Sequence, residues 1–410
     1  MRAKIPWEMS HTCKKVHRGS SFDACFAFQG GFMGFPRMHH HIVFASGQPL
    51  PLVLGASIPK AQPACVHALV TEKMKQSGHN TVLKKALEGR ECRYVEHALQ
   101  GTDPEHIFSA LDAVLKQCQE QTVGVNLNGG TKLMALAAAE WAAIHVLPTF
   151  YIDTEARRIV LPGSTWECLD LPDILDVRTL LAAYGYKIKR MEDNPVPRER
   201  REVLVDMLHL ACKAPPVVRK LNGCAQQAFN SPKRMVKEQG ENIPGWKEML
   251  DLCQRAGMVQ YGNGYVSFPS EGARKWCNGL WFEEFVHMTL YRMHCDKLIK
   301  SWASSVEVYK NRIRNELDAI FCRNNRLFLV ECKTAFLGNK ESLNSASPHL
   351  YNADSLRERL GGVFAKTMLC SVWPLEEYEL ERARALGVEV IFKDGLLQLE
   401  KTLLRWSSMT

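Results

Sequence analysis

Beyond residue 37, the pattern of apolar and polar positions divides the chain into alternating strands and helices. Short apolar runs typical of strands lie at 41–45, 65–70, 93–97 and 123–127. The helix expected after the third run has residues that favour a helix start, an N-capping aspartate followed by a proline in the first turn. Strands that alternate with helices predict a parallel α/β sheet. Residues 1–37 show no sustained period, so we expect a partly disordered extension there.

The pattern changes at residues 194–197, Asn-Pro-Val-Pro, which we interpret as a hinge. Helical patterns follow, and then Asn263-Gly264 lies between two alternating segments, which is a strong hairpin signal. Helices followed by such a hairpin indicate a small winged-helix-like module. We interpret it as an interdomain spacer rather than a DNA reader, because it lacks a concentrated basic recognition helix.

The last part of the chain contains a predicted β-hairpin at residues 315–333, which carries most of the candidate catalytic residues. Asn324-Asn325 suits a two-residue turn, because asparagine tolerates positive φ. A symmetric turn pairs Arg323 with Arg326. The strands on either side are apolar and β-prone.

This register brings acidic side chains together on one face. Asp318 is expected directly opposite Glu331, where paired Cβ atoms lie about 4.5–5.5 Å apart, close enough for both carboxylates to hold one hard divalent cation. Lys333 shares their face. Glu283, on the helix expected at 276–292, is the expected third acidic ligand, and the peptide carbonyl of Cys332 could complete the set.

A Glu-x-Lys tripeptide on a strand is usually an exposed charged pair. Here it follows a buried apolar run, where charged side chains need a partner or a metal. We therefore interpret Asp318, Glu331 and Lys333 as a site for metal-assisted phosphodiester hydrolysis, with Lys333 orienting water or stabilising charge that develops at phosphorus. Glu316 is expected opposite Lys333, positioning it.

Two loops are expected at the carboxyl edge of the first sheet, where such folds bind ligands. One follows the strand at 41–45. The other lies between a buried strand and a helix, whose start offers free N–H groups to an anion. It matches neither the dinucleotide-binding nor the P-loop motif, and by itself a tight turn is as good an interpretation. The candidate ligand-binding residues are Ser46, Gly47, Gln48, Pro49, Asn128, Gly129, Gly130, Thr131 and Lys132.

Composition adds little to this picture. The net charge of +8 is compatible with an anionic partner. The 14 cysteines form no C-x-x-C pair, so we expect reduced, buried thiols and no structural zinc site. His39-His40-His41 is interpreted as the start of a strand. Neither a membrane span nor a convincing secretory signal is present, so we expect a cytoplasmic protein.

The C-terminal motif, D-x12-E-x-K with a helical glutamate upstream, resembles the PD-(D/E)xK nuclease superfamily, although Leu317 stands where a proline is common. Residues 128–134 resemble the strand-end loop of the CARF domain (CRISPR-associated Rossmann fold). With the winged-helix-like middle, residues 38–410 resemble the CRISPR ancillary nucleases of type III systems. This resemblance implies a homodimer that binds cyclic oligoadenylate, with cyclic tetra-adenylate as the expected activator, and then cuts RNA or DNA with Mg²⁺ or Mn²⁺.

The expected organisation is an extension at 1–37, a Rossmann-like CARF domain at 38–193, a winged-helix-like module at 194–271 and a restriction-endonuclease-like domain at 272–410. Two alternatives stay open. One is a non-catalytic regulator that couples a CARF sensor to DNA binding. The other is a restriction or repair endonuclease that no cyclic nucleotide controls.

Overall fold

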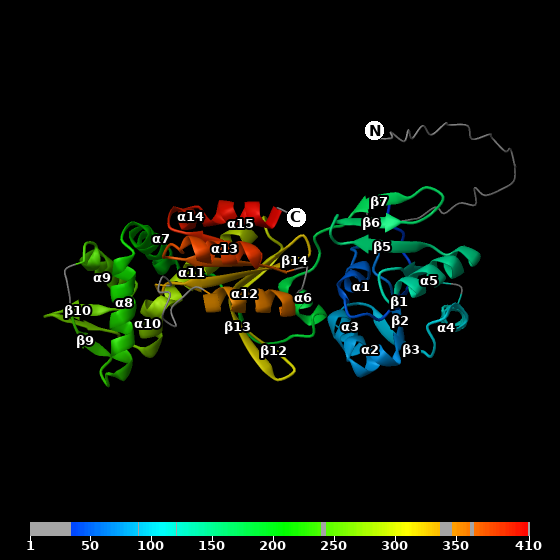
Figure 1. Ribbon diagram of the computed structural model, residues 1–410, viewed down its shortest axis with the longest axis horizontal. Helices are drawn as coiled ribbons and strands as arrows, with labels where there is room; N and C mark the ends of the chain where they lie inside the picture. Colours follow the sequence, from blue (N-terminus) through cyan, green and yellow to red (C-terminus); the bar gives the residue numbers. More distant parts are fainter. Residues whose placement is uncertain are drawn as a thin grey trace, which may run out of the picture.

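A computed structural model describes residues 34–88, 90–119, 121–238, 243–336, 347–360 and 365–408. The extension expected at 1–37 lies outside these residues except for its last four. The N-terminal domain lies at one end of the molecule, the C-terminal domain in the centre, and the middle module at the other end (Figure 1). None of the helices in the described ranges is long and apolar enough to cross a membrane.

The N-terminal domain is built on a seven-stranded sheet of order β3-β2-β1-β4-β5-β6-β7. The first five strands of the chain run parallel, as expected, but the last two pair antiparallel and extend one edge. The strands are β1 (His40–Phe44), β2 (Cys65–Thr71), β3 (Arg93–Leu99), β4 (Val123–Asn126), β5 (Thr149–Asp153), β6 (Arg158–Leu161) and β7 (Glu167–Asp170).

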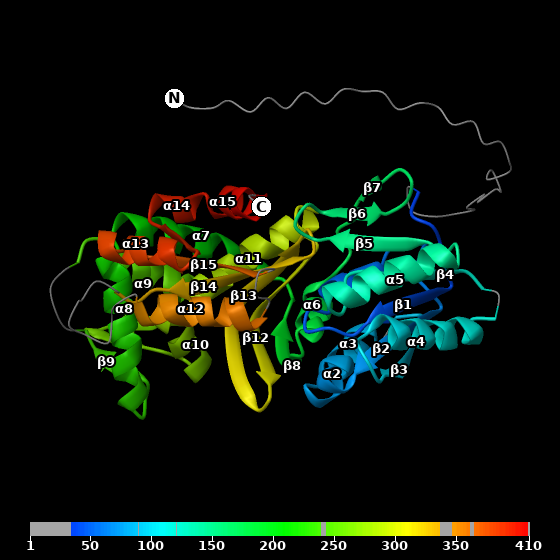
Figure 2. The ribbon, with the colours of Figure 1, turned by 45° about the vertical axis from the view of Figure 1, so that its right-hand side comes forward.

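Helices cover both faces of this sheet because its alternate residues are apolar on both sides. One face packs against α1 (Leu50–Gly55), α3 (His79–Leu87) and α6 (Val177–Ala183), and this core continues into the C-terminal sheet. The other face packs against α4 (Pro104–Gln117) and α5 (Lys132–Ile144). In both views α6 lies between the two sheets (Figure 1, Figure 2). A short helix, α2 (Glu72–Gln76), follows β2.

The middle module combines helices with a three-stranded antiparallel sheet of order β10-β11-β9. Its hairpin turns at Asn263 and Gly264, both with positive φ, as the sequence predicts. The elements are α7 (Arg198–Lys213), α8 (Pro216–Gln227), a short 3-10 helix (Ala228–Asn230), β9 (Met235–Lys237), α9 (Trp246–Arg255), β10 (Gln260–Gly262) and β11 (Tyr265–Ser267).

The C-terminal domain contains a mixed sheet of order β16-β15-β14-β13-β12-β8. Its strands are β12 (Ser301–Lys310), β13 (Ile313–Arg323), β14 (Arg326–Lys333), β15 (Ala365–Ser371), β16 (Val388–Phe392) and β8 (Lys187–Glu192). Strand β8 precedes the boundary expected at residue 194, yet it pairs with β12. The helices are α10 (Glu271–Lys275), α11 (Trp281–Cys295), α12 (Ser347–Leu360), α13 (Glu377–Ala385), α14 (Asp394–Leu397) and α15 (Leu399–Ser408).

Candidate functional site

The β13–β14 hairpin has the register expected from the sequence. Asn324 and Asn325 form the turn with φ of 52° and 58°, and Arg323 pairs with Arg326. Both turn residues have positive φ, as a two-residue hairpin loop of matching twist requires. The pairing continues to Ala319 opposite Val330, which puts the next pair, Asp318 and Glu331, in line.

The carboxylates and the lysine form one largely buried cluster. The Cys332 N–H donates a hydrogen bond of 2.8 Å to Asp318 Oδ2. Lys333 Nζ lies 3.7 Å from that oxygen and 2.5 Å from Glu331 Oε1. The three side chains are only 14–21% exposed. A single ammonium group therefore faces two carboxylates in a site with little solvent.

Glu283, in the first turn of α11, interacts electrostatically with the side chains of this cluster. Burial, and then the charge of Asp318, raises the pKa of Glu283 to about 8. Burial and the charge of Glu331 raise the pKa of Asp318 to about 6. Burial alone would lower the pKa of Lys333, but the two hairpin carboxylates outweigh it and raise that pKa. The site thus carries more acidic groups than its lysine can neutralise.

A kink in the backbone lies just before α11 and Glu283. The sequence pattern predicts one continuous helix at 276–292, and this expectation is wrong. Residues Trp276–Leu280 form a wide turn that ends α10, and Gly279 has φ of 125° inside it. A Cβ on Gly279 would lie 2.8 Å from Thr334 Oγ1, next to Lys333. That hydroxyl also accepts a hydrogen bond from Asn222 on α8.

Two neighbouring glutamates have other roles. Glu284 pairs with Arg200 at 2.8 Å and accepts a hydrogen bond from the Trp276 indole N–H. Glu316, expected to position Lys333, instead pairs with Arg190 and Arg314 and is half exposed. The structure therefore corrects the sequence interpretation of Glu316, because arginines on β8 and on its own strand supply its partners.

The two predicted ligand loops lie side by side in the N-terminal domain, because β1 and β4 are parallel neighbours and both loops leave their carboxyl ends. Ser46 Oγ forms a local turn with the backbone of Gln48. Gly47 and Gln48 are exposed, whereas Pro49 is buried. The first loop ends at Pro49, because α1 begins at Leu50.

The second loop passes close to β1 and then starts a helix. A Cβ on Gly129 would lie 1.8 Å from the Phe44 carbonyl oxygen, so only glycine fits there. Gly130 has φ of 75°. Thr131 caps α5 by accepting a hydrogen bond from the Met134 N–H, and both Thr131 and Lys132 are exposed. The arrangement presents free helical N–H groups, a hydroxyl and an ammonium group to solvent.

Asparagines at the end of β4 hold these loops in place. The Asn128 amide both donates to and accepts from the backbone of Ile152 on β5, so this side chain has a structural task. Asn126, which the sequence interpretation did not single out, is fully buried. It donates to the Pro51 carbonyl and accepts from the Asn128 N–H. The sequence signal that could have revealed Asn126 is its position as a polar residue within the apolar run at 123–127.

The part of the chain that contains the two loops and the part that contains the carboxylate cluster each match a known protein family. Residues 40–162 match the Card1 CARF domain, and residues 270–410 match the endonuclease domain of Card1-like proteins. The C-terminal part of the chain is therefore an endonuclease domain. No curated protein sequence matches the chain.

Solved structures share the whole architecture. Protein VC1899 from Vibrio cholerae is 24% identical with a TM-score of 0.76, over 90% of this chain and 97% of its own. Can2 from Sulfobacillus thermosulfidooxidans, solved in complex with cyclic tetra-adenylate, is 26% identical with a TM-score of 0.73, over 90% and 98%. A type III CRISPR defence DNA nuclease activated by cyclic oligoadenylate is 19% identical with a TM-score of 0.52, over 89% of this chain and 51% of its own.

Proposed function

We propose that this chain, which carries a Card1-type CARF domain and a Card1-like endonuclease domain, is a nuclease that cyclic oligoadenylate activates in type III CRISPR defence. It would act in the cytoplasm on RNA or DNA. The observation that carries the catalytic part is the convergence of Glu283, Asp318, Glu331 and Lys333 from a helix and a hairpin. It supports a phosphodiesterase of the PD-(D/E)xK type.

The donor set fits a hard divalent cation such as Mg²⁺ or Mn²⁺. The carboxylates of Glu283, Asp318 and Glu331 are oxygen ligands of the kind these ions prefer. They outnumber the one nearby ammonium group, which leaves negative charge without a partner in a buried site. With the Cys332 carbonyl they would hold the ion. A bound cation supplies charge neutralisation at the scissile phosphate.

The other steps belong to the chain itself. Lys333 is fixed by its contacts with Asp318 and Glu331, and its raised pKa keeps it charged at any physiological pH. An ammonium group held there stabilises the negative charge that develops on phosphorus oxygens. The Cys332 N–H holds Asp318 in its orientation.

The two loops of the CARF domain form the activator site. Its ligand is a ring of phosphodiesters, and the start of α5, with Thr131 and Lys132 exposed, suits an anion. Gly129 lets the loop backbone lie against β1. Can2, at 26% identity, was solved with cyclic tetra-adenylate, which supports the same ring size here.

A homodimer would let two CARF domains share one ring. The outward side of α5 carries apolar residues, and so does the chain two residues past its end: Leu133, Leu136, Ile144 and Val146 are between 49% and 71% exposed. Exposed apolar residues gathered on one helix mark an association surface. This helix begins at the activator loop, so pairing along it would bring the loops of two chains together.

Cleavage of labelled RNA, single-stranded DNA and duplex DNA tests the catalytic assignment. With Mn²⁺ and cyclic tetra-adenylate, we expect cleavage that Glu331→Gln and Lys333→Ala each reduce by about 100-fold or more. Glu316→Gln is the matched control, because it lies on the same hairpin but pairs with Arg190 and Arg314. Undiminished activity in Glu331→Gln would overturn the site.

The activator is tested separately. Lys132→Ala should weaken binding of cyclic tetra-adenylate by about tenfold, while cleavage at saturating activator is retained. Cleavage that proceeds equally well without any cyclic nucleotide would favour a restriction or repair enzyme. Activator-dependent binding of duplex DNA without cleavage would favour a regulator.

A further inference from the structure

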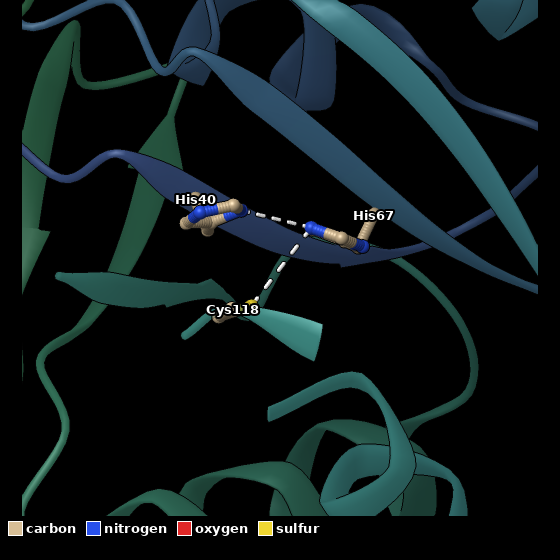
Figure 3. A group of neighbouring side chains, drawn as sticks. All are labelled: His40, His67 and Cys118. Carbon is tan, nitrogen blue, oxygen red and sulfur yellow. Dashed lines mark hydrogen bonds between the residues drawn. The ribbon is translucent and has the colours of Figure 1, made fainter. Parts of the chain in front are cut away.

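A compact group of histidine and cysteine side chains lies in the CARF domain, away from both sites described above. His40 begins β1, His67 lies on β2, and Cys118 caps the C-terminal end of α4. Their side chains point toward one another (Figure 3). Their ligand atoms all lie within 4.8 Å of one another, and each residue is at most 7% exposed.

Strand register explains why the imidazoles meet. Ile42 on β1 pairs with His67 on β2, so His40 and His67 are diagonal neighbours on one face. Leu69 on β2 pairs with His97 on β3, which continues the diagonal by one more ring. The rings are linked by 2.9 Å contacts, from His40 Nδ1 to His67 Nε2 and from His67 Nδ1 to His97 Nε2.

The outer contacts of the two rings can leave one nitrogen of each ring free to bind a metal ion. Gln121 Oε1 accepts a hydrogen bond of 2.7 Å from His40 Nε2, which leaves Nδ1 of the neutral ring unprotonated. His67 can move its proton to Nδ1 and donate it to His97 Nε2, which frees its own Nε2. Metal-binding histidines are held in this way, with the second ring nitrogen donating to an outer partner.

We propose that His40, His67 and Cys118 bind a zinc ion. Two imidazoles and a thiolate are ligands that Zn²⁺ takes in tetrahedral geometry. Bond lengths of about 2.05 Å to nitrogen and 2.3 Å to sulfur place tetrahedral ligands about 3.3 Å apart for N–N and about 3.6 Å for N–S. The observed separations are 2.9 Å between the nitrogens and 3.9 Å from Cys118 Sγ to His67 Nε2. All three ligand atoms lie within 4.8 Å of one another, so binding of an ion would require the side chains to adjust to the tetrahedral separations.

Cys65 is the candidate for the fourth ligand. It pairs directly with His40 in the β1–β2 register and is 2% exposed. Its sulfur does not belong to the group of ligand atoms that lie within 4.8 Å of one another, so its side chain would have to move to complete the set. The Cys118 thiol donates to the Val114 carbonyl, and binding of the ion releases that proton. A set of two histidines and two cysteines is typical of closed structural zinc sites.

The site would stabilise the fold and take no part in cleavage. It fastens the end of α4 to the first residues of β1 and to β2, whereas the activator loops leave the opposite ends of β1 and β4. Its ligands are nitrogen and sulfur atoms, unlike the carboxylate oxygens of Glu283, Asp318 and Glu331, so the two metal sites differ in chemistry. Motif spacing did not reveal it, because the ligands come from three separate elements.

Metal analysis of the full chain, purified without chelators or metal-affinity resin, tests the proposal. We expect about one zinc per chain, and a fall to below about a tenth of that in Cys118→Ala and in His67→Ala. Cys253→Ala removes an equally buried thiol from the middle module and should keep the zinc. Glu331→Gln should also keep it, which separates this ion from any ion at the nuclease site.

A second measurement does not depend on whether the variants fold. Wild-type protein stripped of metal and given Co²⁺ should develop the thiolate-to-cobalt charge-transfer absorption of a tetrahedral site, and one equivalent of Zn²⁺ should remove it. Metal removal should lower the thermal midpoint, and Zn²⁺ should restore it. Wild-type protein without zinc and without the cobalt band would overturn the proposal, leaving only a hydrogen-bonded histidine chain.

Discussion

Among single residues, Glu283 stands out because its carboxyl group is expected to stay protonated at neutral pH when no metal ion is bound. Its pKa rises from 4.5 to about 8, through burial first and then the negative charge of Asp318. The unfolded chain releases this proton at the ordinary value. Between these two pH values the folded state binds more protons than the unfolded state, so stability falls as pH rises.

The chain in the presence of a chelator should therefore lose stability on going from pH 5 to pH 8, by on the order of 1–3 kcal/mol from this site. Glu283→Gln removes the titrating group and should flatten that loss. Denaturant unfolding at both pH values measures it, and Glu377→Gln, which removes an exposed carboxylate paired with Arg384, should keep the wild-type slope. An unchanged slope in Glu283→Gln would show that Glu283 does not titrate in this window.

Sequence reasoning succeeded at the residue scale where the cause is local. Asp318 and Glu331 could be paired from the turn alone, because two asparagines of positive φ set the register of the whole hairpin. Glu316 has the same register but different partners, since Arg190 comes from β8, more than a hundred residues earlier. No local pattern reveals such a partner.

At the scale of elements, we expect the kink at Gly279 to orient Glu283 toward the hairpin. Alanine there would need φ near 125°, which side chains with a Cβ rarely adopt, and its Cβ would meet Thr334 Oγ1 at 2.8 Å. Gly279→Ala should therefore displace the start of α11 and reduce cleavage by about tenfold or more. Binding of cyclic tetra-adenylate, measured by calorimetry, should be unchanged.

Gly272, which begins the same region and meets only Ser270 Oγ at 3.6 Å, is the matched control. Gly272→Ala should cleave like the wild type. Equal activity in both variants would show that the kink does not position Glu283. The pattern of apolar residues could not predict the kink, because it depends on the approach of Thr334, a residue 55 positions later. The histidine and cysteine cluster escaped prediction for the same reason.

At the scale of the whole molecule, the exposed side of α5 predicts a dimer. Leu136 is 69% exposed on this helix, and a glutamate there would have to be buried between two chains. Leu136→Glu should give a monomer by light scattering and should weaken activator binding. Ile313→Glu changes a residue that is 56% exposed on the C-terminal domain and should stay dimeric. A wild-type monomer at micromolar concentration with bound activator would contradict this prediction.

The two domains are in contact at the tip of the β13–β14 hairpin, which carries the proposed catalytic residues. Asn325 Oδ1 accepts hydrogen bonds of 2.9 Å and 3.0 Å from the N–H groups of Ile174 and Leu175. Its amide donates to the Pro172 carbonyl. These backbone groups lie between β7 and α6, and α6 packs under the CARF sheet. A movement of the CARF domain would therefore pull on the turn that sets Asp318 against Glu331.

Asn325→Gly should weaken the coupling between activator and cleavage. Glycine keeps the positive φ of the turn, so the register survives while the side-chain contacts with residues 172–175 are lost. We expect activator affinity to stay within about twofold, while the stimulation of cleavage falls by about fivefold or more, the size of a typical coupling energy. Asn324→Gly changes the neighbouring turn residue, which has the same backbone conformation, and should be stimulated normally. If both variants respond to cyclic tetra-adenylate like the wild type, the signal reaches the hairpin by another route, such as the Cys322 thiol that donates to the Leu175 carbonyl or the Asn325 N–H that donates to Asp173 Oδ1.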